Sequence, residues 1–363
     1  MGGRQGTLES MGMSGAVKPQ FWAGKRVLLT GHTGFKGAWL SLLLERLGAR
    51  VFGYALAPAT EPALFDLLAP FAGQISTIGD IGDAAAVAAA VNAANPDIAI
   101  HMAAQPFVRL SYQAPVATFA TNVMGSLHVL EALRQARHLR AVLVITTDKV
   151  YRNDDAPRPF SEDDPLGGHD PYSASKAACE LAVESFARSF FLARGICVAT
   201  ARAGNVIGGG DFSPDRIVPD VFRAHLLRQT LVLRHPQATR PWQHVLDCLC
   251  GYLLYIEALH AGQVLPAALN FGPDGEPMTV AAVVETLQAA LGATPGWRQD
   301  GGPQPKEAAA LALATGRART QLGWRDRLTT AQAIGQTAAW YGAFRRGNDM
   351  RAHMLDEIER HGF

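Results

Sequence analysis

Charge of one sign, long apolar runs and cysteine are all scarce in this sequence. Its 33 Lys and Arg residues offset 32 Asp and Glu residues, so the formal net charge is only +1. A chain this close to neutral lacks the excess of positive charge that binding to nucleic acid or to an anionic membrane requires. No apolar run reaches the roughly 18 residues that a membrane-spanning helix requires. We therefore expect neither nucleic acid nor a membrane as a partner, and we expect a cytoplasmic location.

Four cysteines in 363 residues are too few for a disulfide framework. His244, Cys248 and Cys250 lie close together in the sequence, but their spacing is not that of a zinc site. The surrounding segment, LDCLCGYLLYIEAL, instead predicts a buried helix, so we expect no metal. Residues 1–20 are rich in Gly, Ser and Met and lack an apolar core. They predict a disordered extension, or an addition that is not native, rather than a secretory signal.

The most informative stretch is a glycine-rich turn between a predicted strand over residues 25–29 and a helical pattern that Gly48 ends. Gly31, Gly34 and Gly37 follow one another at a spacing of three. In a dinucleotide site the first glycine permits the turn, the second lets the backbone approach a pyrophosphate, and the third lets the helix pack close to the sheet. The helix N-terminus then offers free N–H groups to the phosphates. A glycine-rich turn without any ligand has the same pattern and remains the alternative.

Further strands and helices alternate along the first 204 residues. Strands are predicted over 49–55, 75–81, 96–105, 141–151 and 196–202, and helices over 83–95, 114–137 and 171–194. This order predicts an α/β protein with a Rossmann-type, doubly wound parallel sheet. The second strand ends in Tyr54 and Ala55, where an acidic residue would often hold the ribose 2′-hydroxyl of NAD. That position therefore does not distinguish NAD from NADP.

Several residues at the strand ends have two interpretations. Asp80 lies where a carboxylate would contact the cofactor adenine, but it is equally suited to cap the following helix. Asn122 is polar within an apolar helix, and it either orients a catalytic loop or is a satisfied buried amide. Ala103 and Ala104 are small, which lets a cofactor lie across the end of their strand.

A polar segment and a Tyr–Lys pair carry the candidate chemistry. The apolar run from Ala141 ends in polar residues, as central parallel strands do at an active site. Tyr172 and Lys176 are four residues apart on one helix, so they project from the same face. A lysine ammonium beside a phenol is expected to lower its pKa and make it a base for an alcohol proton.

The chain resembles the extended short-chain dehydrogenases/reductases that act on nucleotide sugars, over roughly residues 22–345. The motifs that carry this resemblance are TGHTGFKG, HMAAQ, TTDKVY, YSASK, RAGNVIGGGD, RPWQHVLD, NFGP and LGW. Within the family, the chain is most similar to the 4,6-dehydratases acting on CDP-glucose, because it has GHTGFKG, Lys149 after Asp148, GNVIGGGDF and TRPWQHVLD. In the dehydratases for dTDP-glucose and GDP-mannose, glutamate typically follows the aspartate.

The resemblance implies a mechanism with NAD as an internal redox cofactor and CDP-glucose as the substrate. Tyr172 and Lys176 would remove the 4-hydroxyl proton, and Thr147 would hold that hydroxyl while NAD⁺ takes the hydride. Lys149 would then remove the carbon-5 proton, and Asp148 would protonate the departing 6-hydroxyl. A protonated lysine next door lowers the pKa of an aspartate, so Asp148 is an acid only if desolvation dominates or Lys149 is neutral.

The resemblance also implies two sets of binding residues. For the cofactor these are Gly31, Thr33, Gly34, Phe35, Lys36, Gly37, Asp80, Ile81, Ala103, Ala104, Gln105, Asn122, Thr146, Tyr172 and Lys176. For the substrate they are Gln105, Arg109, Asn205, Arg234 and Arg240. Arginine suits a diphosphate because its guanidinium pairs with phosphate through two hydrogen bonds.

We expect residues 21–204 to form mainly the cofactor-binding domain and residues 205–363 mainly a smaller, mixed α/β substrate-binding lobe. Segments around 243–260 and 268–272 are expected to return to the first domain. Helices 114–137 and 171–194 resemble the pair that makes a four-helix homodimer interface in this family, although they could be covered within the monomer. Another nucleotide-sugar 4,6-dehydratase, a nucleotide-sugar 4-epimerase and a non-catalytic cofactor-binding protein remain alternative functions. The epimerase does not need the Asp148–Lys149 pair, and the non-catalytic protein would be expected to lose Tyr172 or Lys176.

Overall fold

The computed structural model describes residues 15–153, 158–292, 296–302 and 311–363. Its centre is a seven-stranded parallel sheet in the order β11-β6-β5-β4-β1-β2-β3. The strands are β1 (Arg26–Thr30), β2 (Arg50–Ala55), β3 (Gln74–Ile78), β4 (Ile98–His101), β5 (Ala141–Ile145), β6 (Cys197–Ala203) and β11 (Ala268–Phe271). The order reverses between β1 and β4, and ligands of such sheets bind beyond the carboxyl ends of the strands at this reversal.

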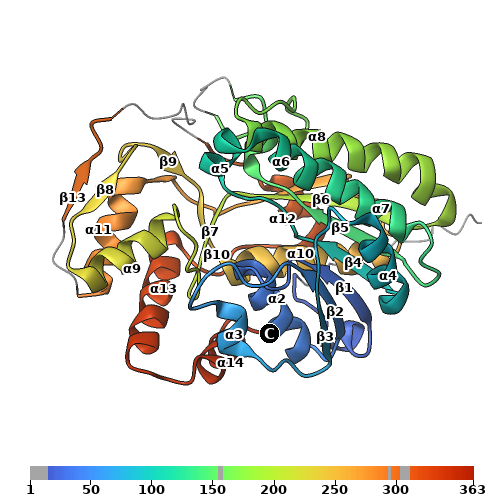
Figure 1. The fold of residues 1–363 in the computed structure, drawn as a ribbon, viewed down its shortest axis with the longest axis horizontal. Coiled ribbons are helices and arrows are strands. Elements are labelled where there is room, and N and C mark those ends of the chain that lie inside the picture. The colour runs from blue at the N-terminus through green and yellow to red at the C-terminus, as the bar shows by residue number, and fades with distance from the viewer. Residues whose placement is uncertain (1–14, 154–157, 293–295, 303–310) are drawn as a thin grey trace, which may run out of the picture.

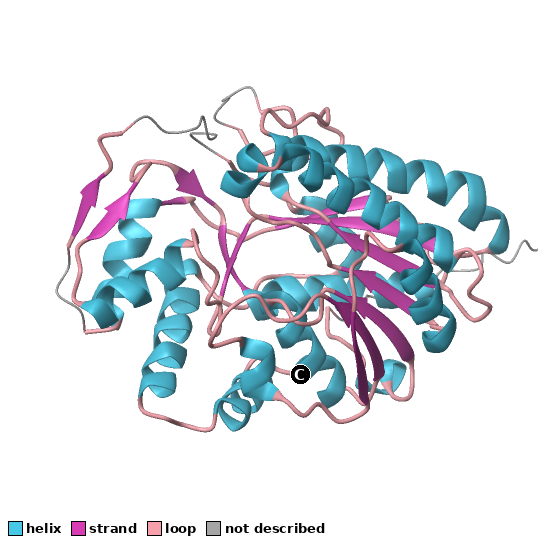
Figure 2. Ribbon diagram, in the orientation of Figure 1, coloured by secondary structure: helices cyan, strands magenta, loops and turns pink. Residues whose placement is uncertain are grey.

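Helices cover both faces of the sheet (Figure 2). Side chains alternate along each strand, so Leu29 packs with α2 (Phe35–Arg46) and α10 (Val245–His260), whereas Leu28 faces the opposite layer. That layer consists of α4 (Ala84–Ala94), α7 (Ser126–Leu133) and α8 (Pro171–Phe186). Both faces are buried at the central strands β4 and β5, which are almost wholly apolar, whereas the edge strand β3 is largely exposed. The predicted doubly wound α/β fold is confirmed.

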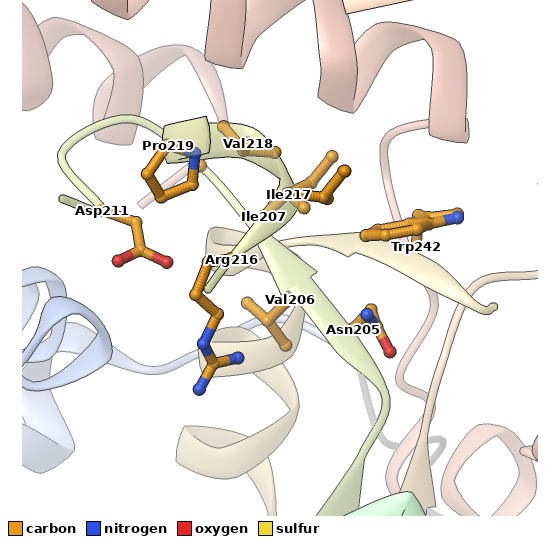
Figure 3. A pocket seen from close by; sticks show the side chains of 10 residues that line it. Asn205, Val206, Ile207, Asp211, Arg216, Ile217, Val218, Pro219 and Trp242 are labelled. Carbon is orange, nitrogen blue, oxygen red and sulfur yellow. The ribbon is translucent and has the colours of Figure 1, made fainter. Parts of the chain in front are cut away.

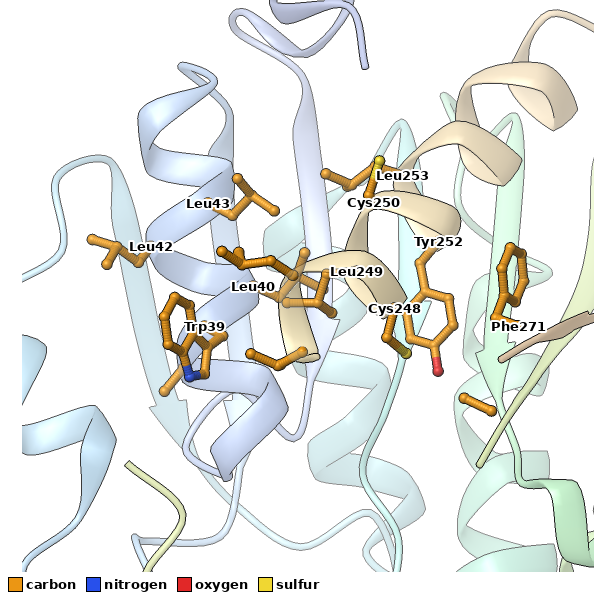
Figure 4. Close-up of a cluster of buried hydrophobic side chains, with 14 of the residues drawn as sticks. Trp39, Leu40, Leu42, Leu43, Cys248, Leu249, Cys250, Tyr252, Leu253 and Phe271 are labelled. Atoms are coloured by element: carbon orange, nitrogen blue, oxygen red, sulfur yellow. The ribbon is translucent and has the colours of Figure 1, made fainter. Parts of the chain in front are cut away.

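Helix α10 comes from the second half of the chain but packs beneath the sheet. Leu249 lies beside Leu40 of α2, and Tyr252 lies against Phe271 of β11 (Figure 4). The predicted buried helix around the two cysteines is therefore confirmed. The later segments also return to the sheet, although the division of the chain into two domains stays a prediction.

The remaining elements form a smaller mixed lobe, at the left of Figure 1. It contains three two-stranded pairs, β7–β10, β9–β12 and β8–β13. Their strands are β7 (Asn205–Ile207), β8 (Leu231–Leu233), β9 (Thr239–Arg240), β10 (Trp242–His244), β12 (Met278–Thr279) and β13 (Trp297–Gln299). Its helices include α9 (Ile217–Leu227), α11 (Val280–Ala290) and α13 (Thr330–Arg345), while α12 (Gly316–Leu322) packs on α10 and α14 (Met350–Arg360) ends the chain.

Some predicted element boundaries were wrong. The single helix expected over 114–137 consists of α6 (Pro115–Phe119), the π-helix η1 (Ala120–Gly125) and α7, which ends at Leu133. The strand expected over 96–105 ends at His101, and the one expected over 75–81 ends at Ile78. In each strand the last expected residues leave the sheet for a loop.

Residues 1–14 of the expected extension lie outside the described residues. Pro19 already begins helix α1 (Pro19–Trp22), which buries Trp22. Within the described ranges, no helix combines the length and apolar character that crossing a membrane requires.

Candidate active site

The glycine turn leaves β1 with each glycine in a different environment. Gly31 has φ +76°, and a Cβ there would lie 2.7 Å from the Ala103 nitrogen. A Cβ on Gly37 would lie 2.1 Å from the Gly31 carbonyl oxygen. At Gly34 a Cβ would meet only that carbonyl, at 3.5 Å, and Gly34 precedes α2 without any side-chain cap. The first and third glycines are thus required by packing, while the second exposes the helix N-terminus, as a bound pyrophosphate requires.

The hydrogen bonds of Asp80 and Asn122 distinguish between the two interpretations of each residue. Asp83, not Asp80, caps α4 by accepting from the Ala86 N–H, so the capping interpretation of Asp80 was wrong. Asp80 instead accepts from the Gly82 N–H at 2.8 Å, and its role towards adenine stays a prediction. The fully buried Asn122 accepts from the Gln105 N–H at 2.8 Å. Its amide donates to the Gln105 carbonyl and to Ser175 Oγ, so it is a satisfied amide that also holds the loop after β4 against α8.

The side chains of three other predicted cofactor residues already have contacts within the protein. Thr33 Oγ1 donates to the Leu56 carbonyl at 2.8 Å. The Gln105 side chain bonds Phe107 and Thr118, and Ile81 packs against Gly125, so each of these two residues offers mainly its backbone.

Tyr172 lies in the first turn of α8, which Asp170 caps. The Thr147 side chain is a hydrogen-bond partner of its hydroxyl. Burial raises the pKa of Tyr172 to about 12, and the Thr147 hydrogen bond opposes that rise. The expected lowering of its pKa was therefore wrong for the protein alone, because desolvation outweighs the neighbouring charges.

Lys176 is buried one helical turn further on. Its Nζ donates to the Ile145 carbonyl at 2.9 Å, at the end of β5. Burial lowers the pKa of Lys176, and the nearby Lys36 lowers it further. Lys36, in the first turn of α2, is itself close to Asp148, which opposes the lowering of the Lys36 pKa by burial.

The segment after β5 contains Asp148 and Lys149, the residues predicted to act as acid and base. Thr146 and Thr147 leave the strand, and residues 148–150 form a short 3₁₀ helix, η2 (Asp148–Val150). Thr147 Oγ1 donates to Asp148 Oδ1 at 2.9 Å, and Lys149 Nζ approaches the same oxygen at 3.4 Å. The Asp148 side chain is 0% exposed and that of Lys149 29% exposed. Asp148 Oδ2 is buried without a hydrogen-bond partner among the described residues, near Gly204 at the start of the second lobe.

A pocket in the second lobe is lined by residues of β7, of β10 and of the start of α9 (Figure 3). Asn205 and Trp242 form one side, and Asp211 and Arg216 lie across from them. Asn205 Oδ1 is buried and has no partner among the described residues, which suits a polar ligand.

The predicted arginines are spread around this lobe. Arg109 is half-exposed and pairs with Asp215 at 2.7 Å. Arg240 is buried in β9 and donates to the Thr239 carbonyl, and Arg234 follows β8. Their roles towards a substrate stay predictions.

Sequence reasoning missed Arg216, whose positive charge opposes the rise in the pKa of Tyr172. It also missed Glu180 and Arg202, a buried ion pair behind the Thr146–Lys149 segment. The sequence pattern could have indicated Glu180, because Tyr172, Lys176 and Glu180 recur every four residues on one helix face. No such pattern indicates Arg216, because it lies in an irregular segment.

The family model described as "NAD dependent epimerase/dehydratase family" matches residues 27–272. The chain belongs to this family. Among its relatives is CDP-glucose 4,6-dehydratase of Salmonella typhimurium, 43% identical over 341 residues, which covers 92% of this chain and 95% of the relative. A dTDP-glucose 4,6-dehydratase of Xanthomonas campestris is 30% identical over 336 residues, 86% of this chain and 92% of the relative.

Solved structures of the family have the same fold. DesIV of Streptomyces venezuelae, a dTDP-glucose 4,6-dehydratase solved with NAD and TYD bound, aligns with a TM-score of 0.76 at 25% identity. That alignment covers 89% of this chain and 98% of DesIV. UDP-glucose 4-epimerase of Thermotoga maritima aligns with a TM-score of 0.74 at 20% identity, covering 88% of this chain and 99% of the epimerase. The family is NAD-dependent, and the uncapped N-terminus of α2 with Gly34 open beside it fits such a dinucleotide.

Proposed function

We propose that this protein is a dehydratase that converts CDP-D-glucose to CDP-4-keto-6-deoxy-D-glucose. The observation that carries the proposal is the position of Asp148 and Lys149, which are joined through Thr147 to Tyr172. A carboxyl group and an amine thus lie directly beside a redox tyrosine. The likeness to the Salmonella CDP-glucose 4,6-dehydratase, at 43% identity, supports the choice of substrate.

The glycine turn, Asp80, the backbone of Ile81 and residues 103–105 would hold NAD, which accepts and later returns a hydride. Tyr172 takes the proton of the substrate 4-hydroxyl, and Thr147 hydrogen-bonds that hydroxyl. Lys176 is fixed by the Ile145 carbonyl on the same helix face as Tyr172, where a cation favours the phenolate. Oxidation at carbon 4 then acidifies the proton on carbon 5.

Elimination requires a base and an acid at the same time. Lys149 is partly exposed and would remove the carbon-5 proton, and Asp148 would donate a proton to the departing 6-hydroxyl. The hydride would then return to carbon 6 and a proton to carbon 5, which gives the 4-keto-6-deoxy product. The Asp148 side chain is fully buried, and its Oδ2 has no hydrogen-bond partner among the described residues, which leaves this oxygen available to the departing hydroxyl.

The nucleotide sugar would extend from this point into the pocket of Asn205 and Trp242 (Figure 3). Asn205 Oδ1 would receive a hydrogen bond from the substrate, and Arg240, Arg234 and Arg109 are the candidates for the diphosphate. A 4-epimerase would use the same tyrosine and lysine, but it needs no acid–base pair for elimination, so Asp148 and Lys149 favour the dehydratase.

We further propose a cytoplasmic homodimer formed through a four-helix interface. Large apolar side chains are exposed on the segments that would form it. Val116 is 82% and Leu181 59% exposed, and Phe119 and Phe190 are also open to solvent. Helices α6 and α8 pack against each other, so these side chains belong to one helical layer. A second copy of the chain would bury them.

The test is incubation with NAD and a panel of CDP-glucose, dTDP-glucose, UDP-glucose and GDP-mannose. We expect CDP-glucose to lose the mass of one water far faster than the others, and its product to carry a 4-keto group. Equal kcat/KM for CDP-glucose and another sugar nucleotide would refute the CDP assignment, and conversion to a 4-epimer without loss of mass would refute the dehydratase.

A further inference from the structure

A buried ion pair lies directly behind residues 146–151, the catalytic segment. Arg202, on β6, donates through Nε to Glu180 Oε1 at 2.9 Å and to Oε2 at 3.0 Å, and through Nη2 to Oε2. Their side chains are 5% and 4% exposed. Two charges removed from water in this way cost more free energy than apolar residues of similar size, so stability alone does not explain the pair.

The pair reaches both ends of the segment that contains the acid and the base. At one end, Thr146 Oγ1 donates to Glu180 Oε1 at 2.6 Å. At the other end, Arg202 Nη1 donates to the Tyr151 hydroxyl at 2.8 Å. Residues 147–149 lie between these two attachments. These hydrogen bonds therefore hold positions 146 and 151, which flank Thr147, Asp148 and Lys149 in the chain.

Tyr151 is in turn anchored to the far edge of the sheet. Its hydroxyl donates to Asn270 Oδ1 at 2.6 Å, and Asn270 is on β11. Asn270 Nδ2 donates to the Phe160 carbonyl at 3.0 Å, and the rings of Tyr151 and Phe160 stack at 5.1 Å. The Tyr151 hydroxyl thus accepts a hydrogen bond from Arg202 and donates one to Asn270, and both partners are buried side chains.

We propose that Glu180, Arg202, Tyr151 and Asn270 are positioning residues that hold Thr147, Asp148 and Lys149 in register with Tyr172. This inference rests on the proposed function, since it assigns these residues to the elimination step. They touch neither the reacting atoms nor the pocket, and they act through the backbone and side chains at positions 146 and 151. A misplacement of about 1 Å costs about 100-fold in rate, so such anchoring has a kinetic effect.

The test uses Tyr151→Phe, which removes the bridging hydroxyl and keeps the stacked ring. The matched control is Tyr255→Phe, because Tyr255 is equally buried and its hydroxyl donates to the Pro266 carbonyl instead. With CDP-glucose we expect Tyr151→Phe to lower kcat by about 10- to 100-fold with KM changed less than about twofold. Tyr255→Phe is expected to retain the wild-type kcat. An unchanged kcat in Tyr151→Phe, or an equal loss in both variants, overturns the proposal.

A second measurement does not depend on the substrate. An amine-reactive ester is added at a fixed pH, and the rate of acylation of Lys149 is followed by peptide mass spectrometry. Because loss of the anchor moves the Lys149 ammonium relative to Asp148 Oδ1, which it approaches at 3.4 Å, this rate should change in Tyr151→Phe but not in Tyr255→Phe. An unchanged rate of acylation in Tyr151→Phe overturns the proposal. If the wild-type protein leaves CDP-glucose unchanged, the proposed function fails, and the labelling still decides whether these residues position Lys149.

Discussion

The Thr147 hydroxyl donates to Asp148 Oδ1 at 2.9 Å, while the same side chain is the hydrogen-bond partner of the Tyr172 hydroxyl. Thr147 therefore joins the residue assigned to oxidation and the residue assigned to elimination. A hydroxyl carries one proton, so Thr147 cannot donate to the Asp148 carboxylate and to a Tyr172 phenolate at once. The two hydrogen bonds of Thr147 are therefore alternatives, and the bond to the Tyr172 phenolate is the one that the proposed oxidation requires.

Replacing Thr147 should change the pH dependence of oxidation. Burial raises the pKa of Tyr172 to about 12, and the hydrogen bond from Thr147 is the largest opposing effect. In Thr147→Val this opposition is lost, so the pKa of Tyr172 rises and less phenolate is present at any given pH. The rate of bound NADH formation should fall, and its increase with pH should move to higher pH. Thr147→Ser keeps the hydroxyl and should retain the wild-type profile, and an unshifted profile in Thr147→Val would contradict this role.

Removing the Tyr172 hydroxyl should abolish oxidation. Tyr172→Phe keeps the buried ring, so the fold and NAD binding should persist. Turnover of CDP-glucose should fall by at least about 10²–10⁴-fold, the scale for loss of a general base. Stopped-flow absorbance should detect no bound NADH. If NADH still forms from substrate at the wild-type rate, the base is another residue.

The sequence predicted those parts of the site that local spacing determines. Gly31, Gly34 and Gly37 lie within one turn, and Tyr172 and Lys176 lie on one helix face, so the structure of each group depends on its neighbours in the chain. The sequence could not predict the anchoring of the catalytic segment. Tyr151 and Asn270 are 119 residues apart and meet only because β11 joins the edge of the sheet beside β6.

The direction of the Tyr172 pKa shift was wrong for a related reason. The spacing of Tyr172 and Lys176 indicates which charge is near, but not how completely both groups are buried. In the folded chain, Lys176 donates to the Ile145 carbonyl, and desolvation becomes the largest effect on Tyr172. Burial depends on the whole fold, and a four-residue spacing carries no information about it.

A charge on the outer face of α6 should dissociate the proposed dimer. Val116→Asp places a carboxylate on a side chain that is 82% exposed in the single chain. In a four-helix interface that carboxylate would be buried without a partner, so the equilibrium should shift to monomer. Val264→Asp is the matched control, because Val264 is 99% exposed in the loop after α10. Sedimentation velocity should show a dimer for the wild type and the control and a monomer for Val116→Asp, and an unaffected dimer would place the interface elsewhere.

Lys149 separates the dehydratase from an enzyme that only oxidises and reduces its substrate. Lys149→Met keeps most of the aliphatic side chain and removes the amine that would act on carbon 5. Oxidation depends on Tyr172, Lys176 and Thr147, so it should still proceed, and turnover should fall by about 10²–10⁴-fold at the elimination step. Bound NADH should therefore accumulate on mixing with CDP-glucose. The carbon-5 hydrogen should also stop exchanging with deuterated water.

Lys149→Arg distinguishes a base from a fixed charge at this position. Its guanidinium keeps a positive charge near Asp148 Oδ1, which Lys149 approaches at 3.4 Å, but its pKa is above about 12 and it cannot accept a proton at neutral pH. If Lys149 is the carbon-5 base, Lys149→Arg should stall at the same step as Lys149→Met and accumulate NADH in the same way. If Lys149 acts only through its charge, by holding Asp148 or the substrate, arginine should restore much of the turnover. In that case methionine should weaken oxidation and elimination together, without any accumulation of NADH, and the assignment of Lys149 as the base would be lost.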